Sequence, residues 1–316
     1  MTMNRVFFAW LALVLTTMAW ASSLILAKIV YAEMTPVVFV ALRYTLASPL
    51  LIVLFLSQKG RYEKAIVSKK NWRVLILVGL TGPFLSQVLQ YIGLSMTTAA
   101  ETLLLLNMSP VFAVVLAYVF LSEPITLDKI GGLLLATLGV SLIVIGGAPI
   151  DTGFGLIRLL GDAIIVVSTF LFAVNGIAGK VAVRSVDSIS VTTFSTLVAV
   201  PCIWICAVLS EDVTVIVRLS LNAWLIIVWV GVVNSVIAFI LYYESMKYIE
   251  ASRVQIALNL ISVWGVLMSV LVLGETTSVL QIMGGALTII GVIVAQKMIQ
   301  NNTPKGSEVE LDGHIL

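Results

Sequence analysis

Two stretches, "LSEPITLDKIGGLLLATLGV" (residues 121–140) and "LVLGETTSVLQIMGGALTIIGV" (residues 271–292), share an unusual arrangement. In each, one glutamate (Glu123 or Glu275) interrupts long apolar runs, and glycines recur every few residues after it. The two glutamates are 152 positions apart (275 minus 123). The chain therefore carries one acid in the same apolar setting twice, which indicates an internal repeat.

The same offset of 152, held without a gap, pairs residues along most of the chain. Apolar matches are weak evidence in so biased a composition, whereas matched Lys, Trp, Tyr and Asn residues at one constant shift are hard to obtain by chance. The pairs are Lys28 with Lys180, Pro49 with Pro201, Trp72 with Trp224, Gly79 with Gly231, Tyr91 with Tyr243, Ala99 with Ala251, Asn107 with Asn259, Gly132 with Gly284 and Gly139 with Gly291. We predict two repeats, residues 5–148 and 157–300, followed by a polar, disordered tail (residues 301–316).

The composition places both repeats in a membrane. The chain has 316 residues, of which 60% are hydrophobic and only 11% charged, and its mean hydropathy is +1.12. A soluble protein keeps roughly a quarter of its residues charged. Apolar runs near 20 residues recur along the chain, long enough to cross about 30 Å of hydrocarbon as helix. They lack the alternation of β-barrel strands, so we predict an all-α, polytopic membrane protein.

The breaks between apolar runs give ten predicted transmembrane helices, five in each repeat. Turn-forming residues mark the breaks, among them Pro36, Gly60, the Glu123-Pro124 pair and "GGAPIDTGFG" near the centre of the chain. The predicted spans are 7–30, 36–57, 73–95, 97–121, 126–147, 158–183, 189–210, 222–246, 251–273 and 276–299.

The distribution of Lys and Arg predicts the orientation of these helices. The loops on the side of the N-terminus carry 14 Lys and Arg residues, and those on the other side carry 3. We therefore expect both termini to be cytoplasmic, in the cell (plasma or inner) membrane. Because five spans is an odd number, the second repeat must cross the membrane upside down. The loop after span two, "SQKGRYEKAIVSKKNWR", is basic, and its counterpart "SEDVTVIVRLSLN" has lost that excess, as an inverted repeat requires.

Several motifs resemble a known family. "WASSLILAK" (20–28), "FVALRYTLASPLL" (39–51) and "YIGLSMTTAAETLLLLNMSPVFAVVLAYVFLSEP" (91–124) are similar to the EamA-type repeat of the drug/metabolite transporter (DMT) superfamily. "YYESMKYIEASRVQIALNLISVWGVLMSVLVLGE" (242–275) is similar to the same pattern. The second copy departs from it at Ser262, which replaces the usual proline seen at Pro110, and at Asn175 and Gly176 in place of a tryptophan-centred pattern.

The resemblance implies a ten-helix transporter, often an exporter of amino acids or related metabolites, with a central cavity between the repeats. Inverted five-plus-five repeats independently favour a binding site near the bilayer midplane and alternating access. We therefore predict a secondary active transporter that exports amino acids or related small polar metabolites. A channel or a non-transporting membrane scaffold remains the alternative.

Other function classes are disfavoured by what the sequence contains. The one histidine, His314, lies in the polar tail, so no intramembrane histidine serves a catalytic triad or a zinc site. Cys202 and Cys206 are interpreted as packing residues. No GxxxxGK[ST] loop occurs, and the basic residues form no single patch. We expect no enzyme activity, metal, cofactor or nucleic-acid partner.

Polar and aromatic side chains deep within the spans are the candidates for substrate binding. Uncharged amides and hydroxyls suit a zwitterionic or polar metabolite, although each of them alone is more often a hydrogen bond between helices. The candidates are Trp20, Ser23, Gln87, Gln90, Tyr91, Asn107, Asn175, Asn234, Tyr242, Gln255 and Asn259, with Ser262 extending the last stripe.

Seven residues are predicted to be structural. Glu123 and Glu275 lie at helix junctions, where an acid caps the N-terminus of the following helix. Arg43, roughly 10 Å inside its span, is expected to pair with a structural partner such as Glu33 or Asp162, and contact with the substrate is the alternative. Gly132, Gly139, Gly284 and Gly291 fall on helix faces with Ala136 and Thr288, and are expected to allow close helix packing.

Five charged residues are candidates for gating or ion coupling. Lys28 and Lys180 end the first helix of each repeat and are either snorkelling anchors or residues that gate the cavity or contact an anion at its mouth. Glu101, Glu244 and Asp162 lie near helix ends, and we expect them to carry the proton if transport is proton-coupled.

Overall fold

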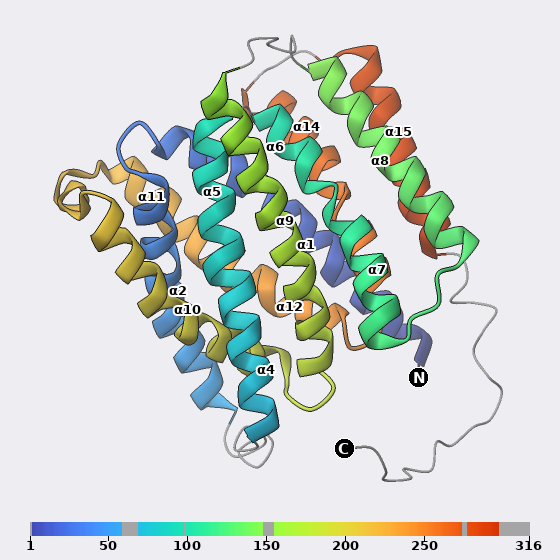
Figure 1. Ribbon diagram of the computed structural model, residues 1–316, viewed down its shortest axis with the longest axis horizontal. Helices are drawn as coiled ribbons and strands as arrows, with labels where there is room; N and C mark the ends of the chain where they lie inside the picture. The colour runs from blue at the N-terminus through green and yellow to red at the C-terminus, as the bar shows by residue number, and fades with distance from the viewer. Residues whose placement is uncertain (1, 59–68, 98, 148–154, 274–276, 297–316) are drawn as a thin grey trace.

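A computed structural model of the protein describes residues 2–58, 69–97, 99–147, 155–273 and 277–296. Every regular element in these residues is a helix (Figure 1). Within these residues, ten helical spans are long and apolar enough to cross a membrane. The predicted all-α architecture of ten spans is confirmed, and the polar tail lies outside the described residues.

The first five spans form the first repeat. They comprise α1 (Thr2–Val30); α2 (Pro36–Ser57); α4 (Lys69–Gly79), η1 (Leu80–Ser86) and α5 (Gln87–Met96); α6 (Ala99–Leu106) and α7 (Ser109–Leu121); and α8 (Leu127–Gly147). The second repeat comprises α9 (Leu156–Ala182); α10 (Ser188–Ser210); the short η2 (Val213–Arg218); α11 (Leu221–Trp229), η3 (Val230–Ile237) and α12 (Ala238–Ser245); α13 (Ala251–Ala257) and α14 (Leu260–Leu273); and α15 (Val279–Gln296).

The third span of each repeat contains a π-helical segment, η1 in the first and η3 in the second. Pro83 lies within η1 and has no N–H to donate to the helical ladder. In η3 the Ser235 hydroxyl donates to the carbonyl of Val230 instead, at 3.3 Å. Two different local causes thus produce the same irregularity at nearly the same depth, where π segments often accompany functional sites.

The fourth span of each repeat is broken, which corrects the prediction of continuous helices over 97–121 and 251–273. The breaks lie at residues 107–108, between α6 and α7, and at 258–259, between α13 and α14. In the first repeat, Pro110 lies in the first turn of α7 and has no N–H to donate to the carbonyl of Leu106, four residues back. In the second repeat there is no proline, but the backbone N–H groups of Leu258 and Asn259 bond to carbonyls three residues back, which tightens the turn.

The two repeats run in opposite directions. α1 begins at the end of the bundle marked N in Figure 1, whereas α9, its counterpart, begins at the opposite end. Two hydrogen bonds show the symmetry that relates the two repeats. The Thr16 hydroxyl donates to the carbonyl of Ala238 at 3.2 Å, and the Ser168 hydroxyl donates to the carbonyl of Ser86 at 2.8 Å. Adding 152 to 16 and to 86 gives 168 and 238, so each repeat's first helix bonds to the other's third span in the same way.

The fifth helices, α8 and α15, lie side by side at one edge of the bundle (Figure 1). A Cβ added at Gly132 would lie 2.5 Å from the carbonyl oxygen of Gly291, and one added at Gly139 would lie 2.6 Å from that of Gly284. Only residues without a side chain allow two backbones to approach so closely. All four glycines predicted to be structural lie in this contact.

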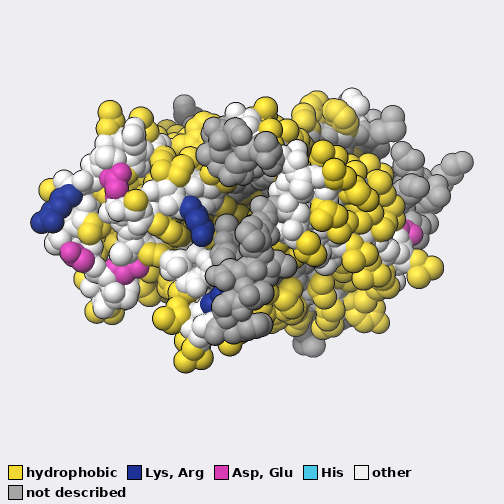
Figure 2. All heavy atoms as spheres, turned by 90° about the horizontal axis from the view of Figure 1, so that it is seen from above, with side chains coloured by type: hydrophobic (Ala, Val, Ile, Leu, Met, Phe, Trp, Pro, Cys, Tyr) yellow, Lys and Arg dark blue, Asp and Glu magenta, His cyan; other side chains and the backbone are white. Residues whose placement is uncertain are grey.

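The surface suits a lipid environment. Seen from above in Figure 2, hydrophobic side chains cover much of the molecule, and charged side chains are few and scattered. Large apolar side chains such as Leu134, Leu138 and Ile145 on α8 are more than half exposed. In water so much exposed apolar surface would be unfavourable, whereas in a bilayer it faces acyl chains.

Candidate functional site

A cavity lies between the two repeats and takes up about 760 Å³, its opening included. Residues of α1, α2, α5, α6, α7, α9, α12 and α14 line it, together with both helix breaks. Thr169 on its wall is halfway along the span Leu156–Ala182, so the cavity reaches the middle of the bundle.

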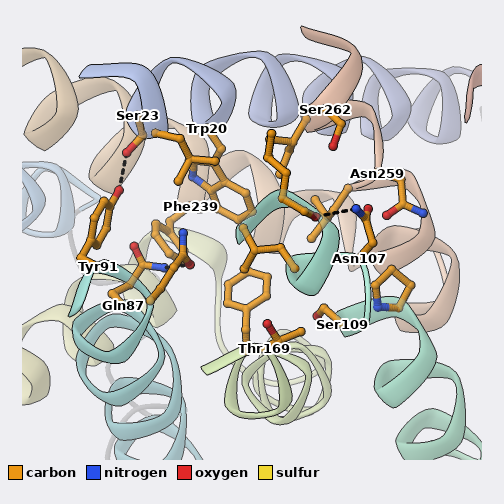
Figure 3. A pocket seen from close by; sticks show the side chains of 18 of the residues that line it. Trp20, Ser23, Gln87, Tyr91, Asn107, Ser109, Thr169, Phe239, Asn259 and Ser262 are labelled. Carbon is orange, nitrogen blue, oxygen red and sulfur yellow. Dashed lines mark hydrogen bonds between the residues drawn. The ribbon is translucent and has the colours of Figure 1, made fainter. Parts of the chain in front are cut away.

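The two broken helices meet at one side of the cavity. Asn107 and Asn259, which are repeat equivalents, both line it and are 6% and 3% exposed (Figure 3). The amide of Asn107 donates to the carbonyl of Leu103 at 2.6 Å and so satisfies a carbonyl near the end of α6. The side-chain nitrogen of Asn259 is buried and has no hydrogen-bond partner among the described residues.

A chain of polar groups lies at the other side of the cavity. The hydroxyls of Ser23 and Tyr91 are 2.5 Å apart, joining α1 to α5 (Figure 3). Nη1 of Arg43 donates to the Tyr91 hydroxyl at 2.9 Å, and Nε of Arg43 donates to the Ser235 hydroxyl at 2.7 Å. The guanidinium carbon also lies 5.0 Å from the ring centre of Tyr44, within the range of a cation–π contact.

Aromatic rings form the wall between these two polar sides. Trp20 lies 5.7 Å from Phe172 and 5.1 Å from Phe239, centroid to centroid. Trp20 and Phe172 are repeat equivalents (172 minus 152 is 20), so each repeat contributes one of them from the same place in its first helix. The tryptophan ring nitrogen donates to the carbonyl of Asn234 at 3.2 Å, which fixes its orientation.

Comparison with known proteins agrees with this geometry. The pattern of the EamA-like transporter family matches residues 7–145 and again residues 159–296. The chain belongs to the EamA-like transporter family. It is 25% identical to "Uncharacterized transporter YyaM" of Bacillus subtilis, over 87% of this chain and 89% of that one. It is 26% identical to an uncharacterized transporter of Archaeoglobus fulgidus, over 89% and 95% of the two chains.

A solved crystal structure has the same fold, with a TM-score of 0.76 at 19% identity, over 92% of this chain and 96% of the other. Family membership makes this protein a multi-pass membrane transporter whose partners are a small-molecule substrate and the lipid bilayer.

Seven of the eleven predicted binding residues of the transporter line the cavity. They are Trp20, Ser23, Gln87, Gln90, Tyr91, Asn107 and Asn259, and Ser262 lines it as well. The other four, Asn175, Asn234, Tyr242 and Gln255, are fully buried and do not line it.

Three of these four act behind the cavity wall. Gln255 accepts from the hydroxyl of Ser109, which does line the cavity, and donates to the Tyr242 hydroxyl at 2.9 Å. Asn175 donates to the carbonyl of Val78 and accepts from Tyr243 at 3.3 Å. Asn175 and Tyr243 are the repeat equivalents of Ser23 and Tyr91, so the same pair lines the cavity in one repeat and is buried in the other.

The expected partners of Arg43 were wrong. Glu33 accepts from the backbone N–H and hydroxyl of Ser220, and Asp162 accepts from the Thr97 hydroxyl. Arg43 instead bonds to the hydroxyls of Tyr91 and Ser235 and lines the cavity. Helix rotation decides which side of α2 faces the cavity, and the nearly uniform apolar sequence of this span carries no amphipathic signal for it.

The cavity residues that were not predicted include Thr169, Phe172 and Phe239. The repeat offset contained a signal for two of them. Phe172 is the equivalent of Trp20, and Phe239 is the equivalent of Gln87 (239 minus 152). Mapping each candidate of the first repeat onto the second would have found these aromatic residues.

Glu123 caps a helix, but not the one predicted. Its carboxylate accepts from the backbone N–H groups of Ala251, at 2.7 Å, and Ser252, at 3.1 Å, at the start of α13 in the other repeat. At the start of α8 the Thr126 hydroxyl occupies the cap position, accepting from the Lys129 N–H at 3.4 Å. Glu275 lies outside the described residues.

The gating and coupling candidates differ in their surroundings. Lys180 donates to the carbonyls of Met246 and Ile249, whereas Lys28 is exposed and has no bond to a described residue. Glu244 accepts from Ser188 and pairs with Lys247, both at 2.6 Å. The side chain of Glu101 lies outside the described residues.

Proposed function

We propose that this protein is a secondary active transporter that exports amino acids or related small polar metabolites by alternating access. The observation that carries the proposal is the cavity itself, which is lined by repeat-equivalent residues of two inverted five-helix repeats. Trp20 with Phe172 and Asn107 with Asn259 are such pairs. Inverted repeats with a site at their interface exchange conformations and so expose that site to each side in turn.

Contacts at the two ends of the bundle support the alternating mechanism. At the end that the Lys and Arg distribution predicts to be cytoplasmic, Glu123 binds the start of α13 and Lys180 binds the end of α12. Lys28, the equivalent of Lys180 at the other end, has no bond to a described residue. The two equivalent lysines are thus bonded differently in this structure, since Lys180 contacts carbonyls of its own repeat and Lys28 contacts no described residue. Such a difference is expected for one state of an alternating carrier.

Purified protein in proteoliposomes tests the function. We expect movement of at least one amino acid or related metabolite from a broad panel, saturable and stimulated by the same compound on the opposite side. Dependence of the rate on an imposed pH gradient tests proton coupling. Absence of movement across the panel would contradict the proposal, and single-channel conductance would favour the alternative of a channel.

Orientation is tested separately. We propose the plasma or inner membrane, with both termini cytoplasmic. Residues 57–73 and 211–221 then lie on opposite sides of the membrane. Labelling of single cysteines with a membrane-impermeant thiol reagent in intact cells is expected to reach only residues 211–221. Labelling of both loops from one side would contradict the inverted topology.

A further inference from the structure

Among the described residues that line the cavity, one carries a buried charge, and no described residue supplies its counter-ion. Arg43 is 2% exposed and lines the cavity, where no Asp or Glu of the described residues joins it. Its two hydrogen bonds go to neutral hydroxyls, those of Ser235 and Tyr91. No carboxylate of a described residue lies within ion-pair distance of its guanidinium.

A guanidinium in this position is an incomplete site. Arg stays protonated in proteins and presents five N–H donors. The two described hydrogen bonds of Arg43 use two of them. A buried charge without an opposite charge is unfavourable, and within membranes such residues usually face a water-filled pathway or a substrate. The rings of Tyr44 and Tyr91 offset part of the charge through their faces, but they supply no anion.

A second unsatisfied donor lies across the cavity. The buried side-chain nitrogen of Asn259 has no partner among the described residues. In Figure 3, Ser23 and Tyr91 lie on one side of the cavity and Asn107 and Asn259 on the other, with Trp20 and Phe239 between them. The cavity thus has a cationic donor at one side, an aromatic middle and a neutral donor at the opposite side.

We propose that this cavity selects organic carboxylates that bear an apolar or aromatic body and a hydrogen-bonding group at the far end. This inference rests on the proposed transport function and narrows its substrate class from amino acids and related metabolites to the related metabolites that carry a carboxylate and no amine. Arg43 binds the carboxylate, Trp20 and Phe239 contact the body, and Asn259 donates to the far group. A primary ammonium group finds no acidic side chain in the described lining, so carboxylates without an amine are preferred over zwitterions.

Matched compounds test the charge preference on the unaltered protein. Uptake into proteoliposomes and the shift in melting temperature are measured for 4-hydroxyphenylacetate, its primary amide and tyrosine, and then for a panel of aliphatic and aromatic acids with their amides. We expect the apparent affinity for the acids to exceed that for their amides by about tenfold to a hundredfold. This is the loss of affinity expected when a hydrogen bond between charged groups is removed. Equal uptake of acid and amide, or preferred uptake of tyrosine, would overturn the inference but leave the transporter. No uptake of any compound would overturn both.

Variants assign the preference to Arg43. R43Q is expected to treat acids and amides alike, and R43K is expected to keep the preference with weaker binding, because Lys is cationic but not bidentate. R218Q removes the same charge from an exposed site outside the cavity and is the matched control. We expect the R218Q protein to keep the preference for acids over amides. A folded R43Q protein that still prefers acids over amides would show that a residue other than Arg43 binds the carboxylate. The comparison of acids and amides on the unaltered protein remains decisive if R43Q does not fold.

Discussion

The carboxylate of Glu123 and the backbone N–H of Ser252 are joined at 3.1 Å, although 129 positions of sequence separate them. Glu123 follows the fourth span of the first repeat, and Ser252 is in the first turn of α13 in the second. An anion at a helix N-terminus satisfies free N–H groups and favours the helix dipole. Here α13, the half-helix that leads to the cavity at Asn259, is capped by an acid of the first repeat. The position of α13 therefore depends on contacts with both repeats.

Removing this cap is expected to destabilise the protein. Glu123→Gln keeps the size of the side chain but replaces one accepting oxygen with a donor that faces N–H groups. We expect a loss of about 1–3 kcal/mol, measured as a lower melting temperature in detergent. Asp128→Asn is the matched control, because it removes a carboxylate from the first turn of α8, which among the described residues accepts only a 3.4 Å bond from Thr126. Equal melting temperatures for the two variants would show that the cap contributes nothing measurable.

The ion pairs around Glu250 predict a dependence of stability on pH. Burial raises the pKa of this carboxyl, but hydrogen bonds from Arg253 and Lys129 outweigh burial and lower the pKa below its ordinary value of 4.5. The folded protein therefore favours the ionised form. Near neutral pH the pairs contribute fully; as the pH falls below 4.5 the unfolded chain takes up the proton first, and the contribution is lost.

We expect Glu250→Gln to melt below the unaltered protein at neutral pH and the difference to shrink as the pH falls below 4.5. Glu250 is 37% exposed, so solvent screening limits the effect to about 1 kcal/mol or less. Melting curves of both proteins across the pH range provide the measurement. A difference that stays constant down to the lowest pH would mean that Glu250 acts by packing rather than by charge.

Much of the architecture could be predicted from the sequence because it depends on local patterns. Span length and apolarity gave ten helices, and the offset of 152 gave two repeats, whose inversion the bond pairs of Thr16 and Ser168 now illustrate. The predictions that were wrong concern contacts between spans. Arg43 bonds to Tyr91 of its own repeat and to Ser235 of the other, and Glu123 caps a helix of the other repeat. No pattern within one span specifies such partners.

The site was predicted only in part for a similar reason. A polar residue within an apolar span faces either the cavity or a neighbouring helix, and both environments select the same amides and hydroxyls. Ser23 and Asn175 occupy equivalent positions, yet Ser23 lines the cavity and Asn175 bonds to Val78 behind it. Small differences in helix rotation and in side-chain size between the repeats decide which of the two is exposed.

Alanine substitutions at two adjacent glycines of α8 test the close contact between α8 and α15. A Cβ at Gly132 would lie 2.5 Å from backbone atoms of Gly291 and Ala295, whereas one at Gly131 would have nothing within 4 Å. We expect Gly132→Ala to destabilise by about 1–3 kcal/mol through overpacking and Gly131→Ala to be neutral or slightly stabilising. Melting temperatures of the two variants provide the measurement. A stable Gly132→Ala protein would show that the two helices can separate at little cost.

Substitutions of Lys28 and Lys180 test whether the two repeats exchange conformations during transport. Lys180 donates to the carbonyls of Met246 and Ile249, whose equivalents near Lys28 are Leu94 and Thr97. If transport exchanges the two conformations, Lys28 forms the equivalent bonds when the opposite end closes. We expect Lys180→Gln to lower the free energy of unfolding by about 1–3 kcal/mol, seen as a lower melting temperature, and to lower the transport rate. Lys28→Gln is expected to lower the rate several-fold with the melting temperature unchanged.

Melting curves and proteoliposome uptake on the same preparations separate these outcomes, and Arg184→Gln, which removes an exposed charge near Lys180, is the control. A lysine that serves only as a snorkelling anchor acts equally in all states, so its loss changes stability and transport together or neither. A fall in rate without a change in stability requires that Lys28 bind in a state other than the one described here. Full transport by Lys28→Gln would therefore show that the two ends close by different contacts, despite their related sequences.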